Sequence, residues 1–123
     1  MVQIIKDKTR NTPSIIYNEK NKSVFFEGDC TPEDSVDFFE SFTPNLINLI
    51  NDNSVNSINF NLNYYNSSSA KCFLDLFITL SKIHNVKNIL NIEWQYDIED
   101  IEMKEAGETF EVITKLNFKF IEN

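Results

Sequence analysis

The chain has 123 residues, of which 41% are hydrophobic and 13% aromatic, so it can bury one compact core and is not a disordered chain. Its net charge of −8 argues against a nucleic-acid-binding protein, because phosphate backbones are bound by clustered Lys and Arg. We therefore expect a single domain over residues 1–123 whose partner is a basic or mixed protein surface.

The chain also lacks the features of membrane, secreted and metal-binding proteins. No apolar run approaches the ~20 residues that span a bilayer, and the N-terminus has no signal-peptide core. The two cysteines, Cys30 and Cys72, have neither metal-ligand spacing nor a secretory context. We expect a reduced, cytoplasmic protein with no membrane association, no cofactor and no metal.

The first third of the chain predicts a hairpin followed by a helix. The polar stretch 6–11 predicts a loose N-terminal segment over residues 1–12, and 15–17 and 23–27 have the composition of two paired strands. A helix is expected to begin after Thr31, its predicted cap, with Pro32 in the first position. Pro44 interrupts the helical pattern and predicts a kink, or a restart capped by Thr43.

The remaining elements are predicted by hydrophobic periodicity. Apolar residues alternate with Asn over 58–64, with polar residues over 90–96, and again over 116–120, which is typical of half-buried strands. Between the first two strands, apolar residues recur at helical spacing over 73–83. The acidic segment 97–111 is interpreted as a solvated helix face, with docking of a basic partner as the second interpretation.

The alternation within the strands predicts the architecture. Strands covered by helices on both faces form continuous apolar runs, whereas these strands each keep a polar side. We therefore predict an α/β fold with a two-layer mixed β-sheet and helices mainly on one face. A doubly wound, receiver-like fold is the alternative.

The junction between the central strand and the following helix is the most informative stretch. Here Tyr65 and Asn66 lead into three hydroxyls, Ser67, Ser68 and Ser69. A helix start offers unpaired N–H groups and the positive end of the helix dipole, which favour a phosphate. Ser and Asn are also the usual caps of ordinary helices, so local chemistry leaves both interpretations open.

Four ordered motifs make the chain similar to the SiaC family, and the similarity extends from about residue 12 to the C-terminus. The motifs are TPSI at 12–15, GDCTPEDS at 28–35, YYNSSS at 64–69 and WQYD at 94–97, followed by Gly107-Glu108 in an acidic helix.

The resemblance implies a fold like that of STAS-type anti-sigma-factor antagonists and a phosphoprotein that switches partners without being an enzyme. A dedicated protein kinase would phosphorylate the junction, and a serine/threonine phosphatase would remove the phosphate. The unmodified form would bind a target, which is a diguanylate cyclase in the characterised system and connects the family to cyclic-di-GMP and biofilm regulation.

The resemblance also assigns residues. The family's acceptor threonine corresponds to Ser67, and the next two serines match the family pattern. The expected partner-binding residues lie in three segments that follow strands: Gly28, Asp29, Thr31 and Glu33; Tyr65, Asn66, Ser68 and Ser69; and Asp97. The ends of parallel strands meet at one edge of a sheet, so these segments are expected to cluster.

Two other function classes remain as alternatives. A phosphoaspartate receiver or small hydrolase needs catalytic acids or a triad, whereas the central strand leads into Asn66 and the chain has one histidine, His84. A constitutive interaction scaffold, in which the serines only cap a helix, differs from a switch through the family resemblance alone.

Overall fold

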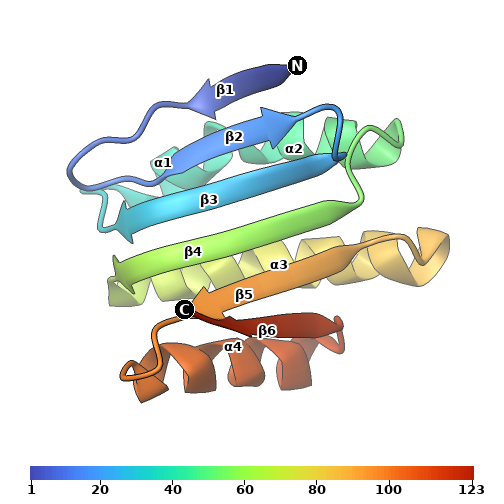
Figure 1. Ribbon diagram of the computed structural model, residues 1–123. Helices are drawn as coiled ribbons and strands as arrows, with labels where there is room; N and C mark the ends of the chain where they lie inside the picture. Colours follow the sequence, from blue (N-terminus) through green and yellow to red (C-terminus); the bar gives the residue numbers. More distant parts are fainter.

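A computed structural model describes all residues from Met1 to Asn123. One six-stranded sheet carries every helix on the same face (Figure 1). This arrangement confirms the predicted two-layer α/β fold. In chain order the elements are β1 (Val2–Lys6), β2 (Ser14–Asn18), β3 (Ser23–Cys30), α1 (Ser35–Glu40), α2 (Thr43–Asn51), β4 (Ser57–Tyr65), α3 (Ser67–Lys87), β5 (Asn91–Tyr96), α4 (Ile101–Thr114) and β6 (Phe118–Glu122).

The sheet is mixed, with the strands in sequence order. β1, β2 and β3 pair antiparallel, whereas β3, β4, β5 and β6 pair parallel. Parallel neighbours need a long crossover, and each crossover here contains helix: α1 and α2, then α3, then α4. The carboxyl ends of the four parallel strands consequently lie along one edge of the sheet.

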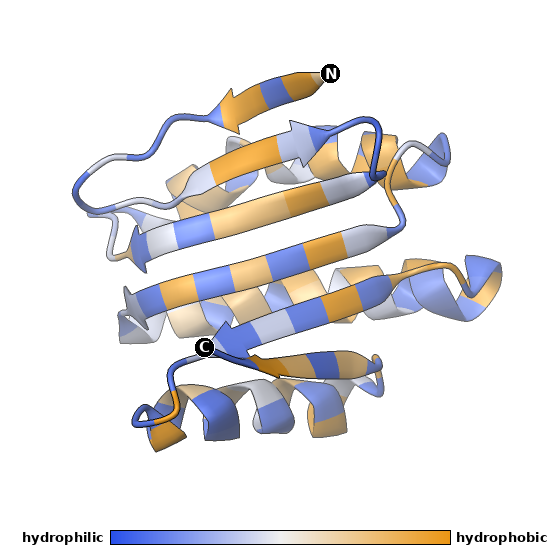
Figure 2. Ribbon diagram, in the orientation of Figure 1, coloured by the Kyte–Doolittle hydropathy of each residue, from blue (hydrophilic) through white to orange (hydrophobic).

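The core lies between the sheet and the helices, and its centre is Phe60 of β4. The Phe60 ring is fully buried and lies 4.7 Å from the ring centroid of Phe26 and 5.2 Å from that of Phe77. Figure 2 shows the alternation of hydrophobic and hydrophilic residues along β4 and β5 that places only one face of each strand in this core.

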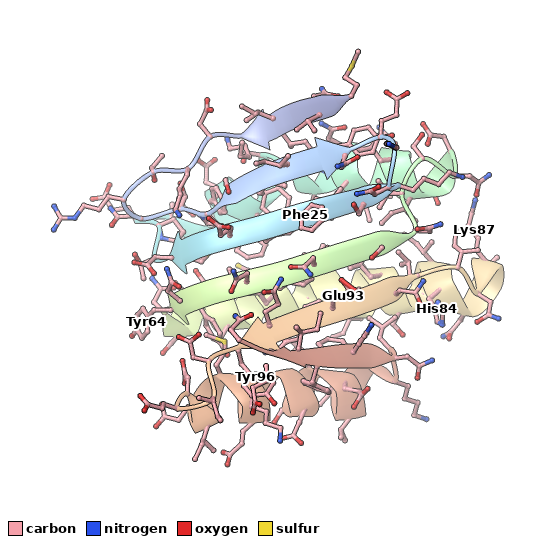
Figure 3. The ribbon with its side chains drawn as sticks, viewed as in Figure 1. Phe25, Tyr64, His84, Lys87, Glu93 and Tyr96 are labelled. Atoms are coloured by element: carbon pink, nitrogen blue, oxygen red, sulfur yellow. The ribbon has the colours of Figure 1, made fainter.

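The other face of the sheet has no helix over it. Phe25 and Glu93 lie on this open face (Figure 3). Here Asn59 donates from Nδ2 to Glu93 Oε2 at 3.1 Å and accepts at Oδ1 from Gln95 Nε2 at 2.7 Å. These bonds satisfy the side chain of Asn59, which is 4% exposed, on the polar face of the sheet.

The N-terminal expectation was wrong for residues 2–6. We predicted a loose segment over 1–12, but Val2–Lys6 forms β1 and pairs with β2, with Ile4 opposite Ile16. Ile5 packs against the core. The strand adds an antiparallel edge to a hairpin that already exists, and its few apolar residues give too short a pattern to distinguish from a polar tail.

The first helix begins later than predicted. Thr31 does not cap it; Asp34 does, by accepting at Oδ1 from the backbone N–H of Asp37 at 2.9 Å. The predicted restart at Pro44 is confirmed, because α2 begins at Thr43 with the proline in its first turn. Thr43 is inside this helix rather than its cap, and its hydroxyl donates to the carbonyl of Phe39 at 2.6 Å.

Gly107 of α4 lies close to two aromatic side chains and leaves little room for a Cβ. A Cβ at this position would lie 2.6 Å from Trp94 Cδ1 and 2.9 Å from Phe120 Cε1. The indole is held in place because its Nε1 donates to the carbonyl of Met103 at 2.9 Å. We expect Gly107→Ala to lower the free energy of unfolding by about 1–2 kcal/mol, since overpacking outweighs the gain in helix propensity.

Urea unfolding followed by far-ultraviolet circular dichroism measures this change. Glu108→Ala is the matched control, because Glu108 is exposed on the same helix and its replacement should change stability by less than about 0.5 kcal/mol. A Gly107→Ala protein as stable as the wild type would contradict the close packing of α4 on β5.

Candidate functional site

The three predicted binding segments meet at the carboxyl edge of the parallel strands. β3, β4 and β5 end at Cys30, Tyr65 and Tyr96, and the segments 31–34, 66–69 and 97–100 follow directly. The backbone N–H of Asn66 donates to the carbonyl of Cys30 at 3.2 Å, which joins the first two segments. This edge is on the left in Figures 1 and 3, where Tyr64 marks the end of β4.

Asn66 caps α3. Its Oδ1 accepts from the backbone N–H of Ser69 at 2.9 Å and from the hydroxyl of Ser68 at 3.2 Å. Its backbone is extended, as is usual for a cap residue. Of the residues that the sequence offered as caps at this junction, the structure uses the asparagine.

Ser67 is the exposed first residue of α3. None of the side-chain hydrogen bonds of the junction involves its hydroxyl. The first N–H groups of a helix have no acceptor within the helix, and the dipole there favours negative charge. Lys71, one turn further along at i+4, is exposed on the same side of the helix. The surroundings of Ser67 are therefore suited to carry a phosphate.

Ser68 and Ser69 belong instead to a cluster that joins the starts of α1 and α3. The Ser35 hydroxyl lies 2.7 Å from that of Ser68 and 3.2 Å from that of Ser69, and the Cys30 thiol donates to Ser69 Oγ at 3.5 Å. Burial raises the pKa of the Cys30 thiol to about 11; the hydrogen bond with Ser69 opposes this rise. The thiol therefore stays protonated and serves as a donor.

Burial separates the predicted contact residues into two groups. Ser69 is 0% exposed, and its hydroxyl lies in the contact between α1 and α3 rather than at the surface, so its predicted partner contact stays a prediction. Gly28 is also buried; at φ 125° a Cβ there would meet Lys8 Cε at 2.9 Å. The remaining predicted residues all offer surface: Glu33, Ser68 and Asp97 are exposed, and Asp29, Thr31, Tyr65 and Asn66 are half-buried.

Sequence reasoning missed two members of the edge. Ser35 ends the motif at 28–35 but was given no role there, and only its contacts with α3 reveal one. The loop after β1 was expected to be loose, but the carbonyl of Asn11 accepts from the N–H of Thr31 at 2.7 Å. Neither contact leaves a local signal, because each joins segments far apart in the chain.

The turn after β5 makes the edge acidic. A hollow of about 430 Å³ is lined by Asp97, Ile98, Glu99, Asp100 and Asn123. Asp100 also caps α4 by accepting from the N–H of Met103 at 3.0 Å. Burial raises the pKa of the neighbouring Tyr65, and the charge of Asp100 adds to the effect. The carboxylates favour a cationic partner surface here.

Two further features bear on the candidate site. No group of three or more His, Cys, Asp and Glu side chains is arranged to hold a metal ion. None of the helices combines the length and hydropathy needed to cross a bilayer.

Comparison with known proteins identifies the family. The model of the SiaC family of regulatory phosphoproteins matches residues 6–123. The chain belongs to the SiaC family. The resemblance inferred from the four motifs is thus confirmed, and no curated protein sequence matches at a significant level.

Solved SiaC structures have the same fold. A chain from the crystal structure of the diguanylate cyclase SiaD in complex with its activator SiaC, from Pseudomonas aeruginosa, superimposes with a TM-score of 0.82. It is 23% identical, and the match covers 94% of this chain and 96% of that one. A second structure, of SiaC of Pseudomonas aeruginosa, superimposes with a TM-score of 0.79. It is 23% identical, and the match covers 96% of both chains. The fold of this SiaC family member therefore agrees with that of the solved proteins.

The capping role of Asn66 can be separated from any role of Ser67. We expect Asn66→Ala to lower the free energy of unfolding by about 1 kcal/mol, because the N–H of Ser69 loses its acceptor. Asn66→Asp keeps an acceptor and should remain close to wild type. Chemical denaturation followed by circular dichroism measures each value.

Ser67→Ala is the matched control, because it removes an exposed hydroxyl at the next position. Its effect should stay below about 0.5 kcal/mol. A larger loss for Ser67→Ala than for Asn66→Ala would mean that the serine hydroxyl, not the asparagine, supports the helix start.

Proposed function

We propose that this SiaC family protein is a binding module switched by phosphorylation of Ser67, and that the unphosphorylated form binds its target through the carboxyl edge of the sheet. The observation that carries the proposal is that the hydroxyl of Ser67 is exposed and makes no hydrogen bond, while Asn66 caps the helix. The hydroxyl at this junction is thus available for chemistry without loss of a structural contact.

The partners follow from the family. A protein kinase would add the phosphate and a serine/threonine phosphatase would remove it, while the chain itself performs no catalysis. The target is a diguanylate cyclase, by analogy with the complex of SiaD and its activator SiaC in Pseudomonas aeruginosa. In this proposal residues 1–123 act as one binding unit in the cytoplasm, where the three partners meet.

The binding surface consists of the accessible residues around Ser67. Glu33 and Asp97 supply negative charge in the segments after β3 and β5, and the half-buried Tyr65 ends β4, the strand between these two. Asp29, Thr31, Asn66 and Ser68 complete the surface. The buried Gly28 and Ser69 support it from below.

The switch is an effect of charge and desolvation. A phosphate adds about −1.5 to −2 charge to one point of the contact surface. A partner that covers Ser67 would have to bury this dianion among the carboxylates of the edge, which is costly unless new cations pair with it. A loss of a few kcal/mol lowers the affinity by orders of magnitude.

The other two function classes fit the junction less well. A phosphoaspartate receiver presents its acceptor Asp at a strand end, whereas β4 ends at Tyr65 and is followed by Asn66. A constitutive scaffold would need no free hydroxyl at Ser67. The scaffold and the switch differ in their response to phosphorylation.

Phosphate should be found on Ser67 after treatment with the cognate kinase. Ser67→Ala should reduce total incorporation at least about tenfold, because the other junction hydroxyls are engaged with Ser35 and Asn66. Peptide mapping by mass spectrometry locates the site. Ser68→Ala is the matched control and should still be phosphorylated; undiminished labelling of Ser67→Ala would assign the acceptor elsewhere.

The phosphorylated protein should bind the target more weakly than the unmodified protein, by about 100-fold if the cost is near 3 kcal/mol. Calorimetric titration of the diguanylate cyclase with the two forms gives both affinities. Ser67→Asp should weaken binding in the same direction but less, since a carboxylate is smaller and carries less charge. Equal or tighter binding of the phosphorylated form would reject the proposed direction.

The same titration with charge-reversal variants locates the surface. Asp97 lies at the carboxyl edge, so Asp97→Lys should weaken binding of the target. Glu108→Lys makes the same change of charge at an exposed position within α4 and should leave binding unchanged. If both variants weaken binding equally, net charge rather than the edge governs the affinity.

A further inference from the structure

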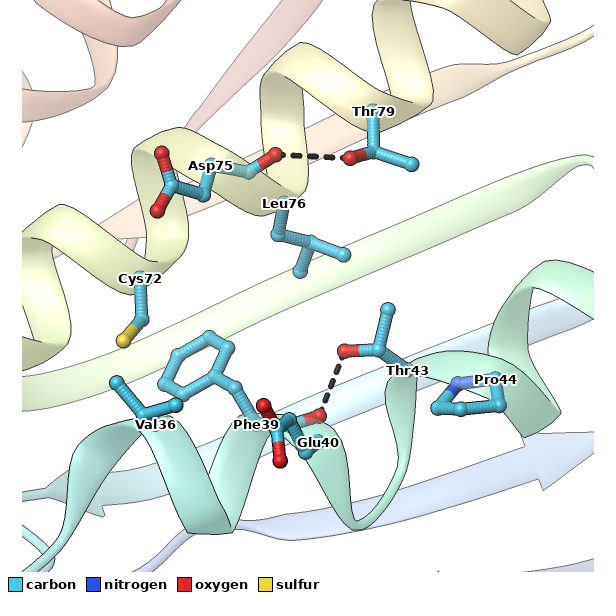
Figure 4. Close-up of a pocket in the computed structure, with 9 residues that line it drawn as sticks. All are labelled: Val36, Phe39, Glu40, Thr43, Pro44, Cys72, Asp75, Leu76 and Thr79. Atoms are coloured by element: carbon cyan, nitrogen blue, oxygen red, sulfur yellow. Dashed lines mark hydrogen bonds between the residues drawn. The ribbon is translucent and has the colours of Figure 1, made fainter.

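A groove crosses the helical layer between α1 and α2 on one side and α3 on the other. It has a volume of about 560 Å³, and Figure 4 shows its walls facing each other. The predicted binding residues do not line it. Its lining residues are Val36, Phe39, Glu40, Thr43, Pro44, Cys72, Asp75, Leu76 and Thr79.

The floor of the groove is apolar. Phe39 from α1 and Leu76 from α3 are 6% and 3% exposed, so they close it against the core. Val36 is 59% exposed, and the thiol of Cys72 points toward it across the gap (Figure 4). An aliphatic or aromatic side chain seated here would remove the Val36 side chain from water.

The rim of the groove is negative on both walls. Glu40 comes from α1 and Asp75 from α3, and both residues are exposed. The single salt bridge of the chain is that between Lys8 and Glu27, so neither rim carboxylate has a cationic partner within the protein. The net charge of −8 adds to the negative potential around them.

We propose that this groove docks a basic segment of a partner protein, with a large apolar side chain on the floor between Val36, Phe39 and Leu76 and with Lys or Arg side chains against Glu40 and Asp75. The rim carboxylates repel phosphate-bearing ligands such as nucleic acid and anionic lipid. A cationic peptide with an apolar anchor satisfies both the floor and the rim. The proposal does not depend on phosphorylation of Ser67.

The groove adjoins the candidate site without being part of it. Val36 follows Ser35 in α1, and Cys72 lies one turn beyond Ser68 and Ser69 in α3. The hydrogen bonds of Ser35 with these serines hold the two walls together at this end. A partner can therefore contact the edge and the groove at the same time.

Three synthetic peptides test the proposal by titration into the ¹⁵N-labelled protein of residues 1–123, with amide chemical shifts as the readout. Acetyl-KRLLRK-amide carries the anchor and the positive charges, acetyl-EDLLDE-amide reverses the charges, and acetyl-KRSSRK-amide lacks the anchor. We expect only the first peptide to produce saturable shifts at Val36, Phe39, Cys72 and Leu76.

Two double variants that change the net charge equally distinguish binding in the groove from nonspecific attraction of the peptide to an acidic protein. Glu40→Lys/Asp75→Lys should weaken binding of acetyl-KRLLRK-amide at least about fivefold. Glu105→Lys/Glu108→Lys, on the exposed side of α4, should leave it unchanged. The proposal is overturned if no saturable shifts occur in the groove, if all peptides act alike, or if both double variants weaken binding equally.

Discussion

The packing of aromatic rings around Phe60 joins the strands and the helix that carry the candidate site. This residue lies in the middle of β4, and its ring contacts Phe26 of β3 at 4.7 Å, Phe77 of α3 at 5.2 Å and Trp94 of β5 at 5.7 Å between centroids. Close-packed aromatic pairs fix geometry as well as burying area. The helix that carries Ser67 is therefore held against the strands whose ends form the candidate site.

The residues of the junction have separate roles, so that a phosphate on Ser67, as proposed, would leave the helix start stable. Asn66 supplies the cap, and Ser69 supplies a buried hydrogen bond to the start of α1. The Ser67 hydroxyl neither caps the helix nor bonds to α1. A charge added to it would change the surface potential and leave the core contacts in place. The proposed switch would therefore change which partners the surface binds and would leave the fold unchanged.

The carboxylates of this acidic chain gather at two places on its surface. Carboxylates surround the hollow at the end of β5, where Asp97, Glu99 and Asp100 meet. Others border the groove between α1 and α3, where Glu40 and Asp75 face solvent. The groove adjoins the start of α3 through the hydrogen bonds of Ser35 with Ser68 and Ser69. On the open face of the sheet, by contrast, Asn59 pairs with Glu93 and Gln95.

The sequence by itself determined the main strands, the long helix and the one-sided layering, because alternation and helical spacing report directly which side of an element is buried. It also pointed to Ser67, through motifs that lie along the chain. Tertiary structure alone decided that Val2–Lys6 joins the sheet, that Asp34 rather than Thr31 caps α1, and that Ser69 is buried. The groove likewise appears only after α1 and α3 pack together. The hydrophobic pattern of a segment shows which side of that one helix or strand is buried. The burial of single side chains such as Ser69 and the groove between helices depend on contacts between elements that are distant in sequence, and the choice of cap depends on the folded backbone.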